Sequence, residues 1–178
     1  MKEFFKGCVF YFINHVLNKI PSRHIRMFFY TLLSKGGISR KASIGLGVKF
    51  LDIRNIIIGD YVNVNFDSIL DGRGGRIKIS KNVDIAPQVN IWSLEHDPQS
   101  ISHESRSGEV TVGENCWIAN RVTILPNSII GANCVIGAGS LVKGVYCDES
   151  IIVGYKAKKI KSKENNSKFQ LRSIRIFR

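Results

Sequence analysis

Cysteine and proline are both scarce in this sequence of 178 residues, with four of each. The cysteines form no Cys-x-x-Cys pair, which excludes the common zinc-binding and redox motifs, and four are too few for the disulfide framework of a small secreted domain. The stretch near the N-terminus is largely apolar, but polar residues interrupt it too often for a predicted membrane span. A cleaved signal peptide is not expected, because its apolar core would be very short and no Ala-x-Ala-like cleavage site follows. These absences favour a cytoplasmic protein.

Acidic residues are also few, with 14 Asp and Glu against 26 Lys and Arg. The excess of basic residues lies at the two ends of the chain. Residues 1–41 carry eight basic residues against one acid and residues 155–178 carry nine against one, whereas residues 42–154 carry nine against twelve. A mildly acidic middle argues against a nucleic-acid groove along the body of the protein, so no nucleic-acid partner is expected.

What the sequence does contain is an aliphatic residue at every sixth position, at Val112, Ile118, Ile124, Ile130, Ile136 and Val142. The same step holds in three earlier blocks: Ile38, Ile44 and Phe50; Ile58, Val64 and Leu70; Ile79, Ile85 and Ile91. Six is neither a helical period nor a plain strand alternation, and a fixed period indicates stacked units. Three hexapeptides make one triangular coil. The pattern therefore predicts an all-β solenoid, a β-helix, over residues 38–161.

A second inward-facing position follows four residues after each of these aliphatic residues. It is occupied by Cys116, Val122, Ser128, Cys134, Ser140 and Tyr146. Five of the six are small, as a narrow and densely packed interior requires. Cys116 and Cys134 are eighteen residues apart, which is one full coil, so we expect them to stack at equivalent buried sites as core residues.

The repeat is interrupted twice, and loops that leave a rigid scaffold are where function usually lies. One slip of three residues falls in residues 70–76. The larger break runs from Ile91 to Val112 and includes Glu95-His96-Asp97-Pro98. We predict a loop over residues 97–109 that leaves the coil just after His96.

Residues 1–37 are predicted to form two helices, with Ser22 as the N-cap of the second and Gly36-Gly37 at its end. Two interpretations remain for this aromatic and basic segment. It packs on the end of the β-helix and covers the exposed edge, or it lies in the headgroup region of an anionic membrane. Residues 162–178 form a basic C-terminal tail, either solvated or in contact with a trimer partner or a membrane.

His96 is the candidate catalytic residue because it lies at the root of the predicted loop. Imidazoles titrate near neutral pH, so one can remove a proton from a sugar hydroxyl as that oxygen attacks an acyl carbonyl. Glu95 and Asp97 flank it, but neighbours on an extended chain point in opposite directions. A backbone carbonyl could equally orient the ring.

Three segments resemble the hexapeptide-repeat acetyltransferases, above all the sugar O-acetyltransferases of bacterial exopolysaccharide and colanic-acid type. They are Asn90-Ile91-Trp92-Ser93-Leu94-Glu95-His96-Asp97-Pro98, Val112-Gly113-Glu114-Asn115-Cys116-Trp117-Ile118-Ala119 and Ile136-Gly137-Ala138-Gly139-Ser140-Leu141-Val142. The resemblance implies a left-handed parallel β-helix and a homotrimer with active sites between subunits. It also implies acetyl-CoA as co-substrate and a sugar or glycan acceptor, with no metal.

The resemblance also implies roles for individual residues. His96 matches the general base. Ala119 and Asn120 would lie beside the thioester, and Asn65 and Asp71 would contact the acceptor. The cofactor would meet Trp117, Ala138, Gly139, Lys143, Lys158 and Lys161, the lysines by contacting its phosphates. The chain departs from its relatives at Lys143-Gly144, where the lysine is displaced by one position, and at Gly154-Tyr155-Lys156-Ala157, which lacks a proline.

The expected activity is transfer of an acetyl group from acetyl-CoA to a hydroxyl of a sugar or polysaccharide precursor. Two enzyme alternatives use the same fold and base: N-acetylation of an amino sugar and O-acetylation of serine. A zinc hydratase is disfavoured because it needs three histidine ligands, whereas only His96 and His103 occur in the coil region. A non-catalytic β-helix scaffold is the remaining alternative.

Overall fold

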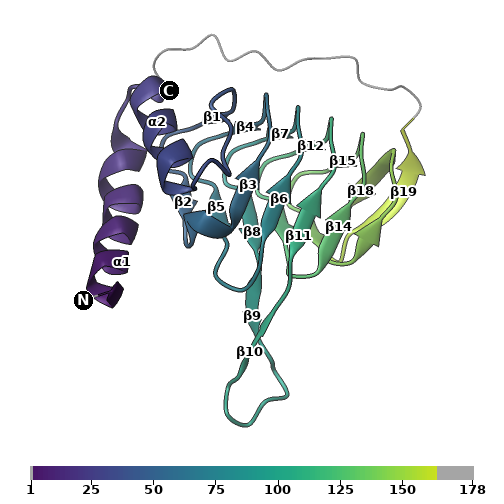
Figure 1. Ribbon diagram of the computed structural model, residues 1–178. Helices are drawn as coiled ribbons and strands as arrows, with labels where there is room; N and C mark the ends of the chain where they lie inside the picture. Colours follow the sequence, from purple (N-terminus) through teal and green to yellow (C-terminus); the bar gives the residue numbers. More distant parts are fainter. Residues whose placement is uncertain (1, 164–178) are drawn as a thin grey trace.

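Three parallel sheets surround one aliphatic core in the computed structural model, which describes residues 2–163 (Figure 1). The first sheet contains, in spatial order, β17 (Val145–Tyr146), β14 (Ser128–Ile130), β11 (Val110–Val112), β6 (Ile77–Ile79) and β3 (Ile56–Ile58). The second contains β1 (Ser43–Ile44), β4 (Asn63–Val64), β7 (Asp84–Ile85), β12 (Trp117–Ile118), β15 (Val135–Ile136), β18 (Ser150–Val153) and β19 (Lys158–Ser162). The third contains β16 (Leu141–Val142), β13 (Thr123–Ile124), β8 (Asn90–Trp92), β5 (Ile69–Asp71) and β2 (Lys49–Phe50).

The register of these strands confirms the period of six. Val112 pairs with both Ile79 and Ile130, and Ile118 pairs with Ile85 and Ile136, so each predicted position lies directly above its equivalent. All fifteen aliphatic or aromatic residues of the repeat are buried, none with more than 1% of its surface exposed. The predicted β-helix is therefore confirmed.

The second inward positions are also buried as predicted, with Tyr146 the one that is only partly covered. Cys116 and Cys134 stack at equivalent sites, because the residues that follow them, Trp117 and Val135, pair in register. Both side chains are fully buried.

Each coil passes through the first, second and third sheets in turn, and two of its corners matter for function. The alanine corner joins the second sheet to the third and comprises residues 45–48, 65–68, 86–89, 119–122 and 137–140. The hairpin corner joins the third sheet to the first and comprises residues 51–55, 72–76, 93–109, 125–127 and 143–144.

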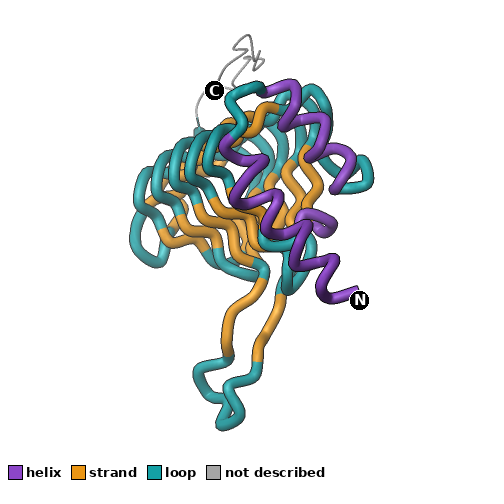
Figure 2. Tube along the Cα trace, turned by 90° about the vertical axis from the view of Figure 1, so that its left-hand side faces the viewer, coloured by secondary structure: helices purple, strands orange, loops and turns teal. Residues whose placement is uncertain are grey.

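The large insertion at the hairpin corner is a β-hairpin. Its strands β9 (Leu94–His96) and β10 (Ser105–Ser107) pair antiparallel and project away from the stack (Figures 1 and 2). The predicted start of the loop after His96 is wrong, because Leu94–His96 pairs with β10 instead of with a strand of the coils. The chain leaves the stack at Ser93, and His96 lies on the hairpin itself.

The N-terminal segment begins as helix α1 (Lys2–Tyr11), continues through a π-helical turn (Phe12–Val16) and a 3₁₀ turn (Leu17–Lys19), and is followed by α2 (Arg23–Leu33). Ser22 occupies the N-cap position of α2 as predicted, although its side chain makes no capping hydrogen bond. Figure 2 shows the helices lying across one end of the coil stack. No helix in the described part of the chain combines the length and the apolarity that crossing a membrane would require.

Helix side chains satisfy the backbone of the first coil where no further strand follows. Asn14 donates through Nδ2 to the Phe50 carbonyl and accepts from the Phe50 N–H through Oδ1, both at 2.9 Å. The Arg26 guanidinium donates to the Ile44 carbonyl at 2.9 Å, and Ser34 Oγ accepts from the Ile38 N–H at 3.0 Å. These bonds replace those that another coil would supply.

The opposite end of the stack closes differently. β19 runs antiparallel to β18 and reverses the chain at the edge of the second sheet. Ala157 donates its N–H to the Leu141 carbonyl at 2.8 Å and accepts at its carbonyl from the Tyr146 hydroxyl at 2.7 Å. Of the predicted basic tail, only Ser162 and Lys163 lie within the described residues.

Candidate active site

His96 is exposed on the hairpin and held by its neighbours. Its Nδ1 lies 3.1 Å from the His103 carbonyl oxygen, and the two imidazole rings stack with centroids 3.9 Å apart and planes 13° apart. A carbonyl oxygen can only accept, so Nδ1 carries the proton in this contact, and in the neutral ring this tautomer leaves the lone pair on Nε2. The sequence did not decide whether Glu95, Asp97 or a backbone carbonyl orients the ring. In the structure a backbone carbonyl, that of His103, contacts it.

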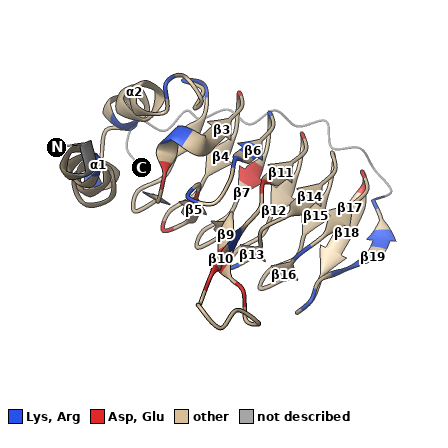
Figure 3. Ribbon diagram, turned by 60° about the horizontal axis from the view of Figure 1, so that its bottom comes forward, with Lys and Arg blue, Asp and Glu red and all other residues tan. Residues whose placement is uncertain are grey.

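Glu95 connects the hairpin to the coils below it. Its Oε1 accepts from Arg106 Nε on β10 and from Lys143 Nζ two coils further along the corner, each at 2.8 Å. The Lys143 hydrogen bond, followed by that of Arg106, holds the pKa of Glu95 below its ordinary value. Figure 3 shows acidic and basic segments meeting where the hairpin leaves the body. Lys143, expected to contact a CoA phosphate, is here the partner of Glu95.

Asp71 lies at the end of β5, directly beside Trp92 in the register of the third sheet. Its carboxylate is fully buried and accepts from Arg73 Nε at 2.9 Å and Nη2 at 3.0 Å. Its carbonyl accepts from Ser93, whose hydroxyl in turn accepts from the N–H groups of Gly74 and Gly75 at 3.0 Å. Asp71 is thus part of the root from which the hairpin rises.

Five predicted site residues lie along the alanine corner: Ala119, Asn120, Ala138 and Gly139 in two neighbouring coils, and Asn65 two coils before Ala119, beyond the corner at residues 86–89. The Ala119 N–H donates to the Ile136 carbonyl at 2.9 Å and is therefore already used in the hydrogen bonding between neighbouring coils. The Asn120 carbonyl accepts from the Gly139 N–H at 3.0 Å, while among residues 2–163 no hydrogen bond of the Asn120 N–H is seen. Asn65 donates through Nδ2 to the Ile85 carbonyl at 2.9 Å. Of these five residues, Asn120 and Ala138 are the two whose N–H makes no hydrogen bond within the described part of the chain, so either can donate to a ligand.

The remaining predicted cofactor residues line the outer face of the second sheet. Trp117 on β12 is half exposed, and Lys158 and Lys161 lie exposed on β19. β12 and β19 belong to the same sheet, separated by β15 and β18. A ligand running along this sheet from the alanine corner would reach the lysines at its C-terminal edge (Figure 3).

The predicted residues therefore form two groups. His96 and Asp71 lie at the hairpin corner, and the cofactor group lies at the alanine corner and on the second sheet. The two corners are separated by one side of the triangular coil, which is six residues long. At 3.3 Å per residue the distance between the corners is at most ~20 Å. Within one chain the structure does not bring the base and the thioester region together.

Sequence reasoning did not single out Arg73 and Arg106, which hold Asp71 and Glu95 in place. The pairing of Arg73 with Asp71 could have been predicted, since an arginine two residues after an aspartate in a Gly-rich interruption of the repeat can reach back to its carboxylate. Arg106 had none, because its pairing depends on the hairpin register of Arg106 with Glu95.

Comparison with known proteins agrees with this architecture. Residues 109–144 match the family described as bacterial transferase hexapeptide (six repeats). The chain is 34% identical over 137 residues to an Escherichia coli K12 protein that carries the provisional name lipopolysaccharide biosynthesis O-acetyl transferase WbbJ; the alignment covers 72% of this chain and 68% of that one.

Two solved structures are similar over nearly the whole chain. A maltose O-acetyltransferase from Clostridium difficile 630 is 26% identical, with a TM-score of 0.77 over 90% of this chain and 86% of that one. A galactoside acetyltransferase in complex with coenzyme A is 25% identical, with a TM-score of 0.77 over 97% of this chain and 88% of that one. The predicted resemblance is confirmed: the chain belongs to the hexapeptide-repeat acetyltransferase family.

Proposed function

We propose that this protein transfers the acetyl group of acetyl-CoA to a hydroxyl of a sugar or sugar-containing precursor. The observation that carries the proposal is the placement of the His96 ring, which is exposed on the hairpin with its Nδ1 bound to a backbone carbonyl, so that in the neutral ring Nε2 is the nitrogen that can accept a proton. Family membership supports the donor and the reaction type, since the relatives named above are O-acetyltransferases and one is bound to coenzyme A.

The proposed reaction is a direct transfer without a covalent acyl-enzyme. His96 Nε2 accepts the hydroxyl proton as the sugar oxygen attacks the thioester carbonyl carbon. The tetrahedral intermediate then collapses, the carbon–sulfur bond breaks, and the leaving thiolate takes the proton from the imidazolium. The Asn120 N–H is the candidate donor to the oxyanion, because the Ala119 N–H is engaged with Ile136.

For the cofactor we propose a path along the second sheet. The pantetheine arm would pass Ala138 and Gly139, where small side chains let the backbone approach. Trp117 would flank the groove, and Lys158 and Lys161 would contact the phosphates. Lys143 is left out of this set because it binds Glu95.

We propose a homotrimer with sites between subunits, which the separation of the two corners within one chain supports. We propose that the hairpin of one subunit reaches the alanine corner of the next, so that His96 and Asp71 come from one chain and Asn65, Asn120 and the cofactor residues from its neighbour. In this arrangement each interface contains one complete site.

We also propose that the outer faces of the helices contact an anionic membrane on its cytoplasmic side. Ile25, Phe28 and Leu32 are exposed on one face of α2, and Phe4 and Phe5 are exposed on α1. Exposed apolar stripes flanked by basic residues are typical of interfacial helices. In a sedimentation assay, binding to phosphatidylglycerol vesicles should be lost in Phe28→Ser/Leu32→Ser. Equal sedimentation of both proteins would contradict the proposal.

Acetyl transfer is tested by incubating the protein with acetyl-CoA and a panel of sugars, amino sugars and serine, with detection by mass. We expect O-acetylated sugar from the wild type and a rate lower by ~10²–10⁴-fold from His96→Ala. Calorimetric binding of acetyl-CoA should be unchanged in His96→Ala and weakened in Lys158→Ala/Lys161→Ala. Acetylation of an amine or of serine alone would replace the proposed acceptor, and no binding of acetyl-CoA would favour a scaffold.

A further inference from the structure

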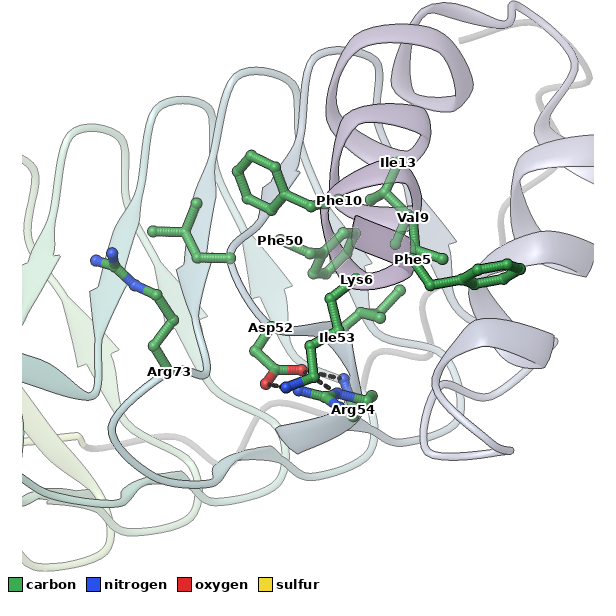
Figure 4. A pocket seen from close by; sticks show the side chains of 12 residues that line it. Phe5, Lys6, Val9, Phe10, Ile13, Phe50, Asp52, Ile53, Arg54 and Arg73 are labelled. Atoms are coloured by element: carbon green, nitrogen blue, oxygen red, sulfur yellow. Dashed lines mark hydrogen bonds and ion pairs between the residues drawn. The ribbon is translucent and has the colours of Figure 1, made fainter. Parts of the chain in front are cut away.

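A groove of about 910 Å³ lies between α1 and the first coils (Figure 4). One wall is formed by α1 through Phe5, Val9 and Phe10, and the other by Phe50 and Leu51 at the hairpin corner. This volume is in the range of small-molecule sites. The apolar lining indicates a ligand with an apolar part.

Charged side chains gather at one end of the groove. Lys6, Arg54 and Arg73 line it together with Asp52; Arg54 pairs with Asp52 and Arg73 with the buried Asp71, so three positive charges face two carboxylates. Arg54 binds both oxygens of Asp52, at 2.8 and 2.7 Å, and this hydrogen bonding holds the pKa of Asp52 below its ordinary value. In Figure 4 the labelled phenylalanines lie toward α1, with the charged residues below and beside them. The groove is therefore amphipathic, with an excess of positive charge at its polar end.

The polar end is continuous with the proposed acceptor site. Arg73 binds the buried carboxylate of Asp71, and the loop that carries Arg73 donates to Ser93 at the root of the hairpin. That loop and the hairpin belong to neighbouring coils, which in a parallel sheet lie ~5 Å apart. A ligand that fills the groove and extends past Arg73 would thus approach the base of the hairpin that bears His96.

We infer that this groove binds the apolar chain of a lipid-linked acceptor, with a phosphate-type linkage at Lys6, Arg54 and Arg73 and the sugar directed toward His96. The inference rests on the proposed function and specifies its substrate class. A hydrocarbon chain matches the apolar walls, and an anionic linkage matches the charge of the polar end. The groove would then select acceptors by their aglycone, at a distance from the hydroxyl that reacts.

A second possible occupant is the chain's own C-terminus, which contains apolar residues. Residues 164–178 carry Lys168, Arg172, Arg175 and Arg178 against Glu164. Like charge with Lys6, Arg54 and Arg73 disfavours this segment, whereas a lipid phosphate is attracted. If the tail did occupy the groove, added alkyl phosphates would bind without dependence on chain length.

The test is calorimetric titration of the full-length protein with hexyl, octyl, decyl and dodecyl phosphate below their aggregation concentrations. Each added methylene should tighten binding two- to fourfold, where fourfold is the change expected for a methylene that becomes fully buried. Gly7 lines the groove, and a side chain added there would meet no atom within 4 Å. Gly7→Trp should fill the groove and weaken dodecyl phosphate binding at least tenfold, while Gly7→Ala, the matched control, should bind as the wild type does.

The charge of the polar end is tested with Lys6→Gln, which should weaken dodecyl phosphate about two- to fivefold and leave uncharged dodecyl glucoside unchanged. The inference would be overturned if the affinity for alkyl phosphates did not change with chain length, or if Gly7→Trp and Gly7→Ala bound dodecyl phosphate equally.

A kinetic series separates this inference from the proposed function. With alkyl glucosides as acceptors, KM should fall as the chain lengthens in the wild type but not in Gly7→Trp. Acetylation with a KM independent of chain length would refute the groove inference and leave the proposed function standing. Chain-length-dependent binding without any acetylation would refute the function and leave a lipid-binding groove.

Discussion

Glu95 is the residue that fixes the hairpin to the coils, and its contribution depends on pH. Because Lys143 and Arg106 lower its pKa in the folded protein, its stabilising effect is fully present above the unfolded-state pKa near 4.3. The effect is lost as the pH falls through the lower folded-state pKa. The hairpin is therefore best held at neutral pH.

Glu95→Gln should consequently loosen the hairpin at pH 7 and have no effect in strong acid. We expect amide hydrogens of β9 and β10 to exchange up to about fivefold faster in the variant at pH 7, since exposed ion pairs contribute ~0.2–1 kcal/mol. Lys143→Met should give a similar increase, and the double variant no more than either. Fully additive effects would show that Glu95 and Lys143 do not act on each other.

The four cysteines should divide into two reactive and two protected thiols. Cys8 and Cys147 are exposed, whereas Cys116 and Cys134 are buried. The hydrogen bond with Cys134 and burial both raise the pKa of Cys116, so this thiol stays protonated and unreactive at pH 8. Alkylation followed by mass measurement should add two labels to the native protein and four after unfolding. Cys147→Ser should reduce the native count to one; rapid labelling of Cys116 would contradict the buried stack.

Single residues differ in how far the sequence predicts them. The buried positions follow from the step of six because each depends only on its neighbours along a regular coil. The partner of Lys143 could not be predicted in this way, since Glu95 is 48 residues away and their contact depends on how the root of the hairpin lies against later coils. His96 was found through its motif, whereas its bond to the His103 carbonyl depends on the conformation of the hairpin tip.

Among the elements, the N-terminal helices close the first coil through specific side chains, and Asn14 is central to this contact. It satisfies both the N–H and the carbonyl of Phe50. Asn14→Leu would leave both groups buried without partners, and each such group costs ~1–3 kcal/mol. We expect the free energy of unfolding in urea to fall by about 2–4 kcal/mol with an unchanged m-value.

His15→Leu is the matched control for Asn14→Leu, because His15 is exposed on the same turn. Its effect should stay within about 0.5 kcal/mol. Equal stability of the two variants would mean that the helices cover the coil without replacing its hydrogen bonds.

The elements themselves were predictable in kind but not in detail. Apolar periodicity indicated two helices, and their ends are close to those expected. The capping bonds of Asn14 and Arg26 were not predictable, because polar residues in an aromatic helix usually face solvent and here they are buried. The hairpin was predicted as a loop that begins after His96, because the antiparallel pairing of Leu94–His96 with Ser105–Ser107 leaves no periodic signal in the sequence.

At the scale of the whole molecule, the division of the site between two corners predicts complementation between inactive subunits. Ala138→Trp would block the proposed cofactor path of its own chain, and His96→Ala would remove the proposed base. In the proposed trimer, an interface of mixed subunits is active when an intact hairpin meets an intact alanine corner, which random assembly gives in about one quarter of interfaces.

Co-refolding the two variants in equal amounts should therefore restore about one quarter of the wild-type activity. Each variant refolded alone should stay inactive. Absence of recovery in trimers verified by ultracentrifugation would place the whole site within one chain.

The two closed ends of the stack also decide what kind of assembly the protein can form. A bare coil end presents unpaired N–H and C=O groups that match the opposite end of another copy, and such head-to-tail contacts do not close on themselves. The helices at one end and the reversed strand β19 at the other act as terminators of this potential one-dimensional polymer. Both features disfavour head-to-tail stacking of copies, so we expect contacts between copies to form through the sheet faces and the projecting hairpin, which favours a closed oligomer over a fibre.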